Sequence, residues 1–376
     1  MIIGRADIKQ FNELAQEKEV ICFGAGKYFD IFFSYCPELI TKVKFIVDNN
    51  PEKWNTFRNF SNTKIKIISS EKLSEILNDK SILLVTVGNN LILQILKQLE
   101  NMDFLSNREV FGSTFILNEL ETWNLLFKKT LPNNLKLTKE PLIPKKIHYC
   151  WVGGNPIPKK YQEYIDGWKR LCPDYEIIRW DESNYDIEKN QYMKQAYEQK
   201  KWGFVSDYMR KDIIYKYGGI YLDTDVEMIK CLDDLLYQNG FCGVEPLRGC
   251  RGVNLGLGFG ARKGLPIIKE LRDVYEGESF SFVRNSRFMK IGPDFEIEVL
   301  LRHGLKLNYE YQIIADMTIY PLEVLSGTTF YNDESFITKN TYTVHHYSNT
   351  WKDKVQIEDE ETCREIYKSF VQRRKL

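Results

Sequence analysis

Short apolar runs alternate with amphipathic stretches along the first third of the chain. The apolar runs predict strands at 20–23, 43–47, 65–68 and 82–87. Helical spacing of apolar residues follows from Gly26 to Phe33, from Ser70 to Leu77 and from about 91 to 99. Strands that alternate with helices indicate a parallel sheet with helices on both faces. We therefore expect residues 1–120 to form a small Rossmann-like parallel α/β domain.

A stretch punctuated by prolines interrupts this pattern. Pro132, Pro141 and Pro144 fall in or next to it, and they predict a connector over residues 121–142. Beyond it, apolar runs predict strands at 146–152, 175–180 and 220–223, and amphipathic stretches predict helices at 161–171 and 203–216. The pattern predicts a second α/β domain over residues 143–376.

The turn after the first strand contains Gly24-Ala25-Gly26, which is part of a dinucleotide-binding fingerprint. That fingerprint needs a third glycine for close helix packing, and Phe29 stands at its position. An acidic residue, Asp48, does follow the second strand. The residues leave three interpretations open. In order of preference they are a scaffold without a cofactor, a nucleotide-binding domain and a domain that supports hydride transfer.

Composition and charge narrow the classes of function. The 376 residues contain 52 Lys plus Arg and 52 Asp plus Glu, so the formal net charge is zero, and 43% are hydrophobic. A neutral chain argues against a nucleic-acid partner, which requires a basic surface. No apolar run is long enough to span a membrane, and the N-terminus lacks the apolar region of a signal peptide. We expect a cytoplasmic protein with reduced cysteines, and the basic tail Arg373–Leu376 leaves peripheral contact with the inner face of the membrane open.

Candidate chemistry lies at Asp223-Thr224-Asp225, at the end of an apolar strand. Residues two apart in an extended segment point to the same side, so these carboxylates face one another. A divalent cation relieves their repulsion, and oxygen ligands favour Mg²⁺ or Mn²⁺ with positions left for a diphosphate. Two solvated turn aspartates are the alternative for this motif taken by itself.

The helix that leads into this strand carries a second candidate pair. Asp207 and Arg210 are three positions apart, so they share one face of the helix over 203–216. Arg offers a fixed fork of donors to a diphosphate, and Asp accepts hydrogen bonds from sugar hydroxyls. A surface ion pair on an amphipathic helix is the alternative.

Together these residues resemble a known family. The strings Ser206-Asp207-Tyr208-Met209-Arg210 and Tyr215 to Asp225, with an opening strand from Ile143 to Gly154, are similar to the signature of the Asp-x-Asp sugar transferases of glycosyltransferase family thirty-two. The family includes the yeast initiating mannosyltransferase and bacterial capsule and lipopolysaccharide enzymes, and the clostridial glucosylating toxins are distant relatives. The resemblance covers about residues 143–352. It implies a GT-A type nucleotide-sugar transferase domain with a bound metal, preceded here by the smaller Rossmann-like domain.

The resemblance also implies roles for single residues. The implied catalytic residues are Asp207, Arg210, Asp223 and Asp225. The implied donor-binding residues are Trp151, which would stack on the nucleotide base, and Val152, Gly153, Tyr221, Thr224, Asn254 and Trp351. The implied metal ligands are Asp223 and Asp225, with a third from the C-terminal segment His345–Trp351, where we expect His346 first and Asn349 second. A Gly292-Pro293 turn resembles one near the acceptor, so Asp294 and Glu296 are acceptor-side candidates.

We therefore expect a retaining glycosyltransferase, dependent on Mn²⁺ or Mg²⁺, that moves a hexose from a UDP- or GDP-sugar to a lipid-linked saccharide. Its expected role is in bacterial capsule or lipopolysaccharide synthesis; retention and role come from the resemblance alone. Two rivals stay open. A nucleotide-sugar sensor or docking protein would bind without turnover. An aspartate-nucleophile phosphatase would use Asp223 within Leu222-Asp223-Thr224-Asp225-Val226.

Overall fold

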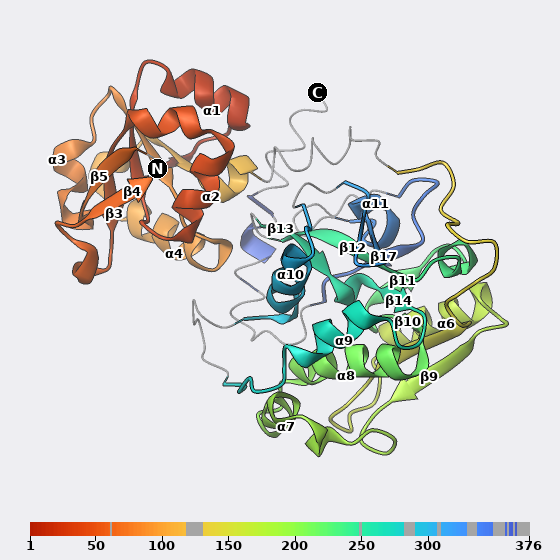
Figure 1. The fold of residues 1–376 in the computed structure, drawn as a ribbon. Coiled ribbons are helices and arrows are strands. Elements are labelled where there is room, and N and C mark those ends of the chain that lie inside the picture. Colours follow the sequence, from red (N-terminus) through yellow and green to blue (C-terminus); the bar gives the residue numbers. More distant parts are fainter. Residues whose placement is uncertain are drawn as a thin grey trace. The chain divides into compact units, whose positions relative to one another are not determined.

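The structure is a computed structural model that describes residues 1–60, 62–117, 131–247, 250–281, 290–306, 310–328 and 337–348, with 358, 361–363 and 365–366 near the C-terminus. Within these residues the chain forms two compact units (Figure 1). The first contains the described residues up to 117, residue 250 and those from 358, and the second contains the rest. Both units combine helices with sheets that contain parallel strands, which confirms the predicted α/β class.

The first unit is built on one sheet whose described strands, seven in number, lie in the order β1-β7-β6-β2-β3-β5-β4. They are β1 (Ile2–Ile3), β2 (Glu19–Phe23), β3 (Val43–Asp48), β4 (Phe57–Phe60), β5 (Thr63–Ser69), β6 (Ser81–Val85) and β7 (Glu109–Gly112). The four apolar runs of the sequence form β2, β3, β5 and β6. These four strands are parallel where they pair, and β4 pairs antiparallel with β5 at the edge.

Helices connect these strands and bury their apolar faces. They are α1 (Ile8–Ala15), α2 (Lys27–Tyr35), α3 (Leu73–Ile76) and α4 (Asn89–Glu100). Asp7 begins α1, because its carboxylate accepts from the Gln10 N–H while the Gln10 side chain accepts from the Asp7 N–H. Phe11 of α1 and Phe32 of α2 are fully buried, with their rings edge to face at 5.7 Å. The core of this unit is therefore strongly aromatic, and a ring pair of this kind adds to the burial of its area.

Side chains of the first unit pack against the glycine turn between β2 and α2. Gly24 has φ +116°, and a Cβ there would lie 2.6 Å from the Val87 side chain, so only glycine fits. Asp48 accepts the Ala25 N–H of this turn at 2.8 Å and pairs with Lys53 at 2.9 Å. Burial raises the pKa of Asp48, but hydrogen bonds from Ala25 and other donors lower the pKa by more than burial raises it. The pKa of Asp48 therefore lies below its usual range. The acid that a dinucleotide site uses for ribose is thus engaged here, which favours the scaffold alternative.

The second unit contains a mixed sheet in which the described strands β15-β16-β12-β14-β10-β8-β9 are neighbours in that order, with β13 paired to β12. They are β8 (Lys146–Cys150), β9 (Glu176–Trp180), β10 (Gly219–Tyr221), β12 (Gly240–Leu247), β13 (Cys250–Asn254), β14 (Phe259–Ala261), β15 (Gln312–Ile314) and β16 (Met317–Tyr320). Strand β10 lies in the middle, parallel to β8 and antiparallel to β14. A separate two-stranded sheet pairs β11 (Val226–Met228) with β17 (Thr343–His345).

The helices of this unit are α6 (Lys159–Leu171), α7 (Gln191–Glu198), α8 (Trp202–Tyr217), α9 (Pro266–Asp273), α10 (Gly292–Arg302) and α11 (Leu322–Leu325). Helix α8 packs against α7, α9 and β8 (Figure 1). Because neighbours surround it, its middle turns are buried on all sides, including charged residues. Those buried charges have to be paired, and they build the site described below.

A buried histidine holds the turn that leads from α8 into β10. His148 of β8 is inaccessible to solvent, and its Nε2 lies 2.9 Å from the Gly218 carbonyl oxygen. Its Nδ1 accepts the Trp180 indole N–H at 3.0 Å, which assigns the ring proton to Nε2 as the donor to Gly218. Gly219 has φ +111°, and a Cβ there would lie 2.9 Å from the same Nε2. Burial lowers the pKa of His148 to about 4, so this ring is neutral at pH 7.

Part of the predicted connector belongs to the second unit. Residues 121–130 lie outside the described residues. In the remainder, the Leu137 and Leu142 N–H groups donate to the carbonyl oxygens of Tyr237 and Leu236, each at 2.9 Å. This segment therefore continues the second unit through backbone hydrogen bonds, and the position of the domain boundary stays a prediction.

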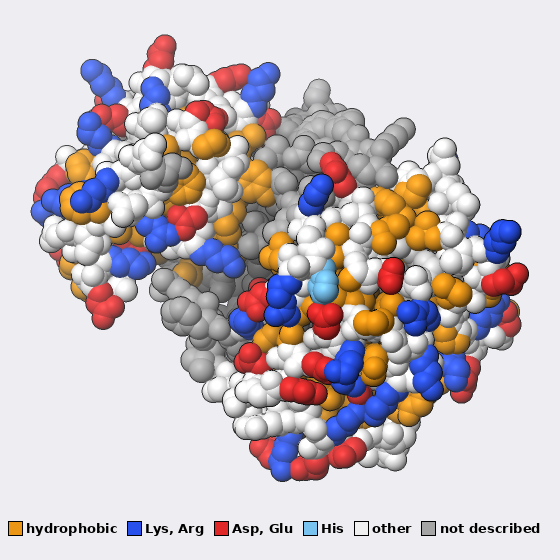
Figure 2. All heavy atoms as spheres, in the orientation of Figure 1, with side chains coloured by type: hydrophobic (Ala, Val, Ile, Leu, Met, Phe, Trp, Pro, Cys, Tyr) orange, Lys and Arg blue, Asp and Glu red, His pale blue; other side chains and the backbone are white. Residues whose placement is uncertain are grey.

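On the face drawn in Figure 2, acidic and basic side chains are interspersed on both units. Among the described residues, no helix combines the length and the apolar composition that crossing a membrane requires.

Candidate active site

The Asp-x-Asp motif lies where the central strand β10 ends and β11 begins. The Asp223 and Asp225 side chains keep 28% and 15% of their surface exposed. Strand β11 pairs with β17 so that Val226 lies opposite His345, which brings the end of the second unit to the motif. The Trp168 indole N–H donates to the Val226 carbonyl at 3.0 Å and holds β11 against α6.

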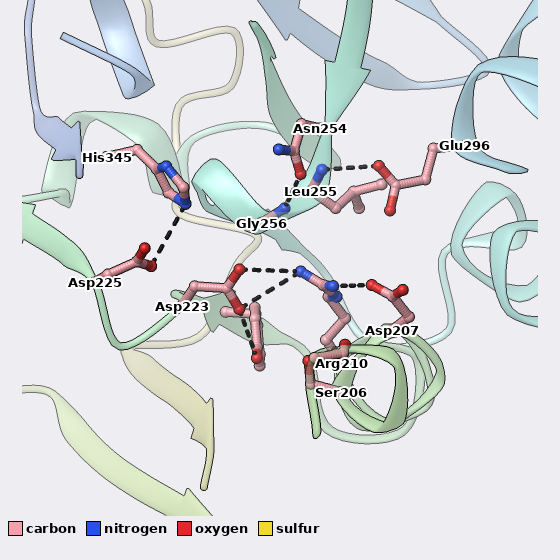
Figure 3. Close-up of polar contacts among 12 residues, drawn as sticks. Ser206, Asp207, Arg210, Asp223, Asp225, Asn254, Leu255, Gly256, Glu296 and His345 are labelled. Atoms are coloured by element: carbon pink, nitrogen blue, oxygen red, sulfur yellow. Dashed lines mark hydrogen bonds and ion pairs between the residues drawn. The ribbon is translucent and has the colours of Figure 1, made fainter. Parts of the chain in front are cut away.

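Three side chains converge at this point. Asp223, Asp225 and His345 each present one ligand atom, and these atoms lie within 4.8 Å of one another. His345 Nε2 is 3.5 Å from Asp225 Oδ1 (Figure 3). Burial raises the pKa of Asp223; the Arg210 charge lowers it and the Asp225 charge raises it, so the pKa lies above its usual range. The Arg210 guanidinium pairs with Asp223 and also with Asp207, while Asp225 adds a second carboxylate, so the cluster is short of positive charge.

This donor set fits a divalent cation. Two carboxylate oxygens and an imidazole nitrogen suit Mn²⁺, whereas Mg²⁺ prefers oxygen alone. Backbone groups already hold Asp225: the Ser348 N–H donates to its Oδ2 at 2.8 Å and the His346 N–H to its carbonyl oxygen at 3.1 Å. His345 Nδ1 accepts the Tyr347 N–H at 3.2 Å, so a metal bound at Nε2 requires the ring proton to move to Nδ1 and that hydrogen bond to open.

The structure places His345, and not His346, with the two aspartates. His346 Nε2 lies 2.9 Å from Glu227 Oε2, and its ring stacks on Tyr164 at 4.9 Å. Successive residues of an extended segment point to opposite sides, so only one of the two histidines can face the motif. The other proposed ligand, Asn349, and the proposed donor contact, Trp351, lie outside the described residues.

Arg210 joins the motif to helix α8. Figure 3 shows its guanidinium group between Asp223 and Asp207. Its Nη1 is 3.3 Å from Asp223 Oδ2, and its Nη2 pairs with Asp207 Oδ1. Tyr221 OH donates to Asp223 Oδ1 at 3.0 Å. The buried Nε–H of Arg210 has no hydrogen-bond partner among the described residues.

A glycine turn after β13 covers this ion pair. A Cβ on Gly256 would lie 2.6 Å from Asp223 Oδ2 and 3.1 Å from Arg210 Nη1. Asn254 shapes the turn, because its Oδ1 accepts the Gly256 N–H and its Nδ2 donates to Glu245, both at 2.6 Å. The sequence interpretation placed Asn254 here but missed Gly256 and Glu245. The alternating glycines from Gly256 to Gly260 were the available signal.

The predicted donor contacts on β8 and β10 lie at the strand ends. Trp151 is half-buried, with its indole N–H donating to the Asn155 carbonyl at 2.6 Å. Gly153 has φ +91°, and its N–H donates to Glu182 at 2.5 Å. Val152 is buried and Thr224 is half-buried. The indole edge of Trp151 is therefore engaged, while a ring face is what stacking on a base requires.

The two acceptor-side candidates have partners inside the protein. Asp294 lies in the first turn of α10, where its Oδ2 accepts the Ile291 N–H at 3.0 Å. Glu296 is inaccessible to solvent and pairs with Lys211 at 2.9 Å. As placed, Glu296 therefore faces the interior and not an acceptor.

Comparison with known proteins finds a family match across this site. Residues 158–242 match the family described as "Glycosyltransferase sugar-binding region containing DXD motif". This stretch holds Asp207, Arg210 and the motif Asp223–Asp225, so the match covers both the helix and the motif of the candidate site.

Individual relatives match parts of the chain. It is 40% identical to "Inositol phosphoceramide mannosyltransferase 3" of Schizosaccharomyces pombe over 34% of this chain and 37% of that protein. It is 27% identical to "Subversion of eukaryotic traffic protein A" of Legionella pneumophila over 40% of this chain and 29% of that protein. The chain thus spans about a third of the length of these relatives. Among solved structures it is similar to "PaToxG Glycosyltransferase", with a TM-score of 0.35 and 18% identity over 50% of this chain and 76% of that one, a likeness too low to carry an argument.

Proposed function

We propose that the second unit is a metal-dependent, GT-A type glycosyltransferase that moves a hexose from a nucleotide diphosphate sugar to a hydroxyl group. One observation carries the proposal. Asp223, Asp225 and His345 converge beside the Arg210 fork, and the two aspartates and Arg210 lie in a stretch that matches a DXD-containing glycosyltransferase region. The three converging side chains would hold Mn²⁺ or Mg²⁺, and such an ion supplies neutralising charge to a departing diphosphate.

The protein's own groups suggest how the transfer proceeds. The Arg210 guanidinium lies beside the motif and would donate to a phosphate oxygen of the leaving group. Asp207 is held beside Arg210 and would accept a hydrogen bond from a hydroxyl group of the donor sugar. The bond from the anomeric carbon to the diphosphate oxygen breaks while the acceptor oxygen bonds to that carbon, and the acceptor proton passes to the departing oxygen. The sequence resemblance implies that the sugar keeps its anomeric configuration.

The donor and the acceptor are open to direct test. The name of the fungal relative favours mannose and hence a GDP-sugar, with a UDP-sugar as the second donor. It also makes a phosphoinositol lipid an acceptor to test beside the lipid-linked capsule or lipopolysaccharide saccharide that the resemblance implies. With either acceptor we propose a cytoplasmic enzyme that works at the membrane face. We propose that the first unit serves for docking, because Asp48 already fills its glycine turn.

A thermal-shift panel tests the donor first. UDP-, GDP-, CMP- and dTDP-sugars are each added with and without Mn²⁺, and a ligand at 100 times its dissociation constant adds about 2.7 kcal/mol to the free energy of unfolding. The expected result is a shift with one nucleotide that requires Mn²⁺, followed by release of that nucleoside diphosphate on turnover. A shift without metal and without turnover would overturn the proposal and favour a sensor.

A further inference from the structure

A second ion pair lies directly behind the candidate active site. Lys211 follows Arg210 in α8, and Glu296 is in the second turn of α10. Lys211 Nζ is 2.9 Å from Glu296 Oε1, and the two side chains are 0% and 1% exposed. Removing two charges from water costs more than most such pairs return, so this pair is weak evidence for stability. Its other contacts indicate a different role.

Glu296 holds the glycine turn through its second oxygen. Its Oε2 accepts the Leu255 N–H at 2.9 Å (Figure 3). Leu255 lies between Asn254 and Gly256, which are joined by the hydrogen bond from the Gly256 N–H to Asn254 Oδ1. Glu296 therefore fixes the middle of the turn, while Glu245 holds its first residue, Asn254.

Lys211 ties that carboxylate to the helix that carries the catalytic candidates. Its Nζ donates to the Asp207 carbonyl oxygen at 2.9 Å and lies 3.3 Å from Tyr275 OH. Lys211 thus links Glu296 to the helical turn that presents Asp207 and Arg210.

The glycine turn has little room to move. The Cα of Gly256 lies so close to the ion pair between Asp223 and Arg210 that a single added carbon would clash. A displacement of the turn toward the pair is blocked, and a displacement away from it would uncover Asp223 and Arg210 to water. A shift of about 1 Å at such a point can cost roughly 100-fold in rate.

We propose that Lys211 and Glu296 are a positioning pair, which holds the turn 254–256 over Asp223 and Arg210 at the distance that sugar transfer requires. This inference rests on the proposed function and deepens it. Neither side chain reaches the reacting atoms, because both are buried. The pair acts through the Leu255 N–H on one side and the Asp207 turn on the other.

Two neutral double variants separate the hydrogen bond from the charges. Lys211→Met with Glu296→Gln removes both charges but keeps an acceptor for the Leu255 N–H. Lys211→Met with Glu296→Leu removes the charges and the acceptor. A third variant, Glu296→Asp, keeps the charge but is too short to reach Lys211 and Leu255 together, and it serves if the Leu variant does not fold.

The readouts are kcat, the donor KM and amide hydrogen exchange in a peptide that covers residues 251–260. We expect the Met/Leu variant and Glu296→Asp to lose roughly 10- to 100-fold in kcat, with faster exchange in that peptide, while the Met/Gln variant stays within about 3-fold of the wild type. Equal kcat and equal exchange in the Met/Gln and Met/Leu variants would overturn the proposal. Asp212→Asn is the matched control, because Asp212 is the next residue of α8 and pairs away from the turn.

The experiment also distinguishes this proposal from the proposed function. If the wild type turns over none of the donors, the proposed function fails, and exchange in residues 251–260 still decides whether the pair holds the turn. If the wild type is active and the Met/Leu variant is as active with unchanged exchange, only the positioning role fails. A control that loses kcat as strongly as the Met/Leu variant would also overturn it, because the loss would then follow from any weakened α8.

Discussion

Helix α8 contributes residues to two carboxylate clusters, and they differ in how completely the protein neutralises them. Asp212 is inaccessible to solvent and pairs with three cations, Lys189, Lys216 and Arg272, while Tyr185 OH donates to it at 2.8 Å. Burial raises the pKa of Asp212, but these donors lower the pKa by more than burial raises it, so the pKa lies below its usual range. This cluster is complete without any ligand.

The cluster around Asp223 is incomplete. Asp223 receives Arg210 and the Tyr221 hydroxyl, but Arg210 is shared with Asp207, and Asp225 adds a second negative charge. Burial and the neighbouring Asp225 charge raise the pKa of Asp223. Burial of a carboxylate is therefore not enough to indicate a functional site. A deficit of positive charge does indicate one, because a bound cation or ligand has to supply the charge that the protein does not.

The largest effect is expected at the motif itself. Asp225→Ala removes a ligand from the converging group, so turnover with the donor identified above should fall by a factor of about 1,000 or more. Mn²⁺ should no longer raise the melting temperature of this variant. Asp174→Ala removes an exposed carboxylate elsewhere in the same unit and should leave turnover unchanged. Near-normal turnover of a folded Asp225→Ala protein in Mn²⁺ contradicts the assignment.

The same substitution in the two clusters should change stability in opposite directions. Asp212→Asn leaves three cations without their carboxylate and should lower the free energy of unfolding by about 3 kcal/mol. Asp223→Asn replaces a carboxylate whose ionised form the folded protein disfavours, so in metal-free buffer it should raise the melting temperature. Thermal unfolding of both variants in chelator at pH 7 checks the pair. A loss of stability in both would mean that Asp223 is as fully neutralised as Asp212.

A smaller effect is expected from His148, a buried neutral side chain of β8. Its folded pKa of about 4 lies below the ordinary value of 6.5, so the unfolded chain binds the proton more readily. The stabilising contribution is complete above pH 6.5 and is lost as the pH falls toward 4. Between pH 7 and pH 5 this residue should remove about 2 kcal/mol from the free energy of unfolding.

Denaturant titrations at the two pH values measure this difference. His148→Gln cannot titrate, so its stability should change less between pH 7 and pH 5 than that of the wild type. An equal change in both proteins would assign the pH dependence to other groups.

The local sequence pattern was sufficient to predict the secondary-structure elements and the Asp207–Arg210 side of the candidate site. The apolar runs predicted β2, β3, β5 and β6, because each is a short buried strand bounded by turn residues. The spacing of Asp207 and Arg210 placed both on one face of α8, where they pair. These features depend on neighbours within a few residues, which a sequence displays directly.

Contacts between distant segments were not predictable in the same way. The choice between His345 and His346 depends on the register of β17 against β11, in which Val226 lies opposite His345. A shift of one residue would exchange their faces, and nothing in the local pattern sets that register. Glu296 was expected near the acceptor, but the packing of α10 directs it to Lys211 in the interior.

Local sequence was thus sufficient to predict the α/β class, the strand that leads to Asp223 and Asp225, and the helical face that presents Arg210. The packing of distant segments sets which carboxylates are neutralised, which histidine joins the motif and which turn covers it. The cause of this division is that periodicity and side-chain chemistry are local properties, whereas burial and charge balance depend on every segment that packs against a residue. Asp212 and Asp223 are both acidic residues near one helix, and their surroundings alone make one a structural group and the other a candidate ligand.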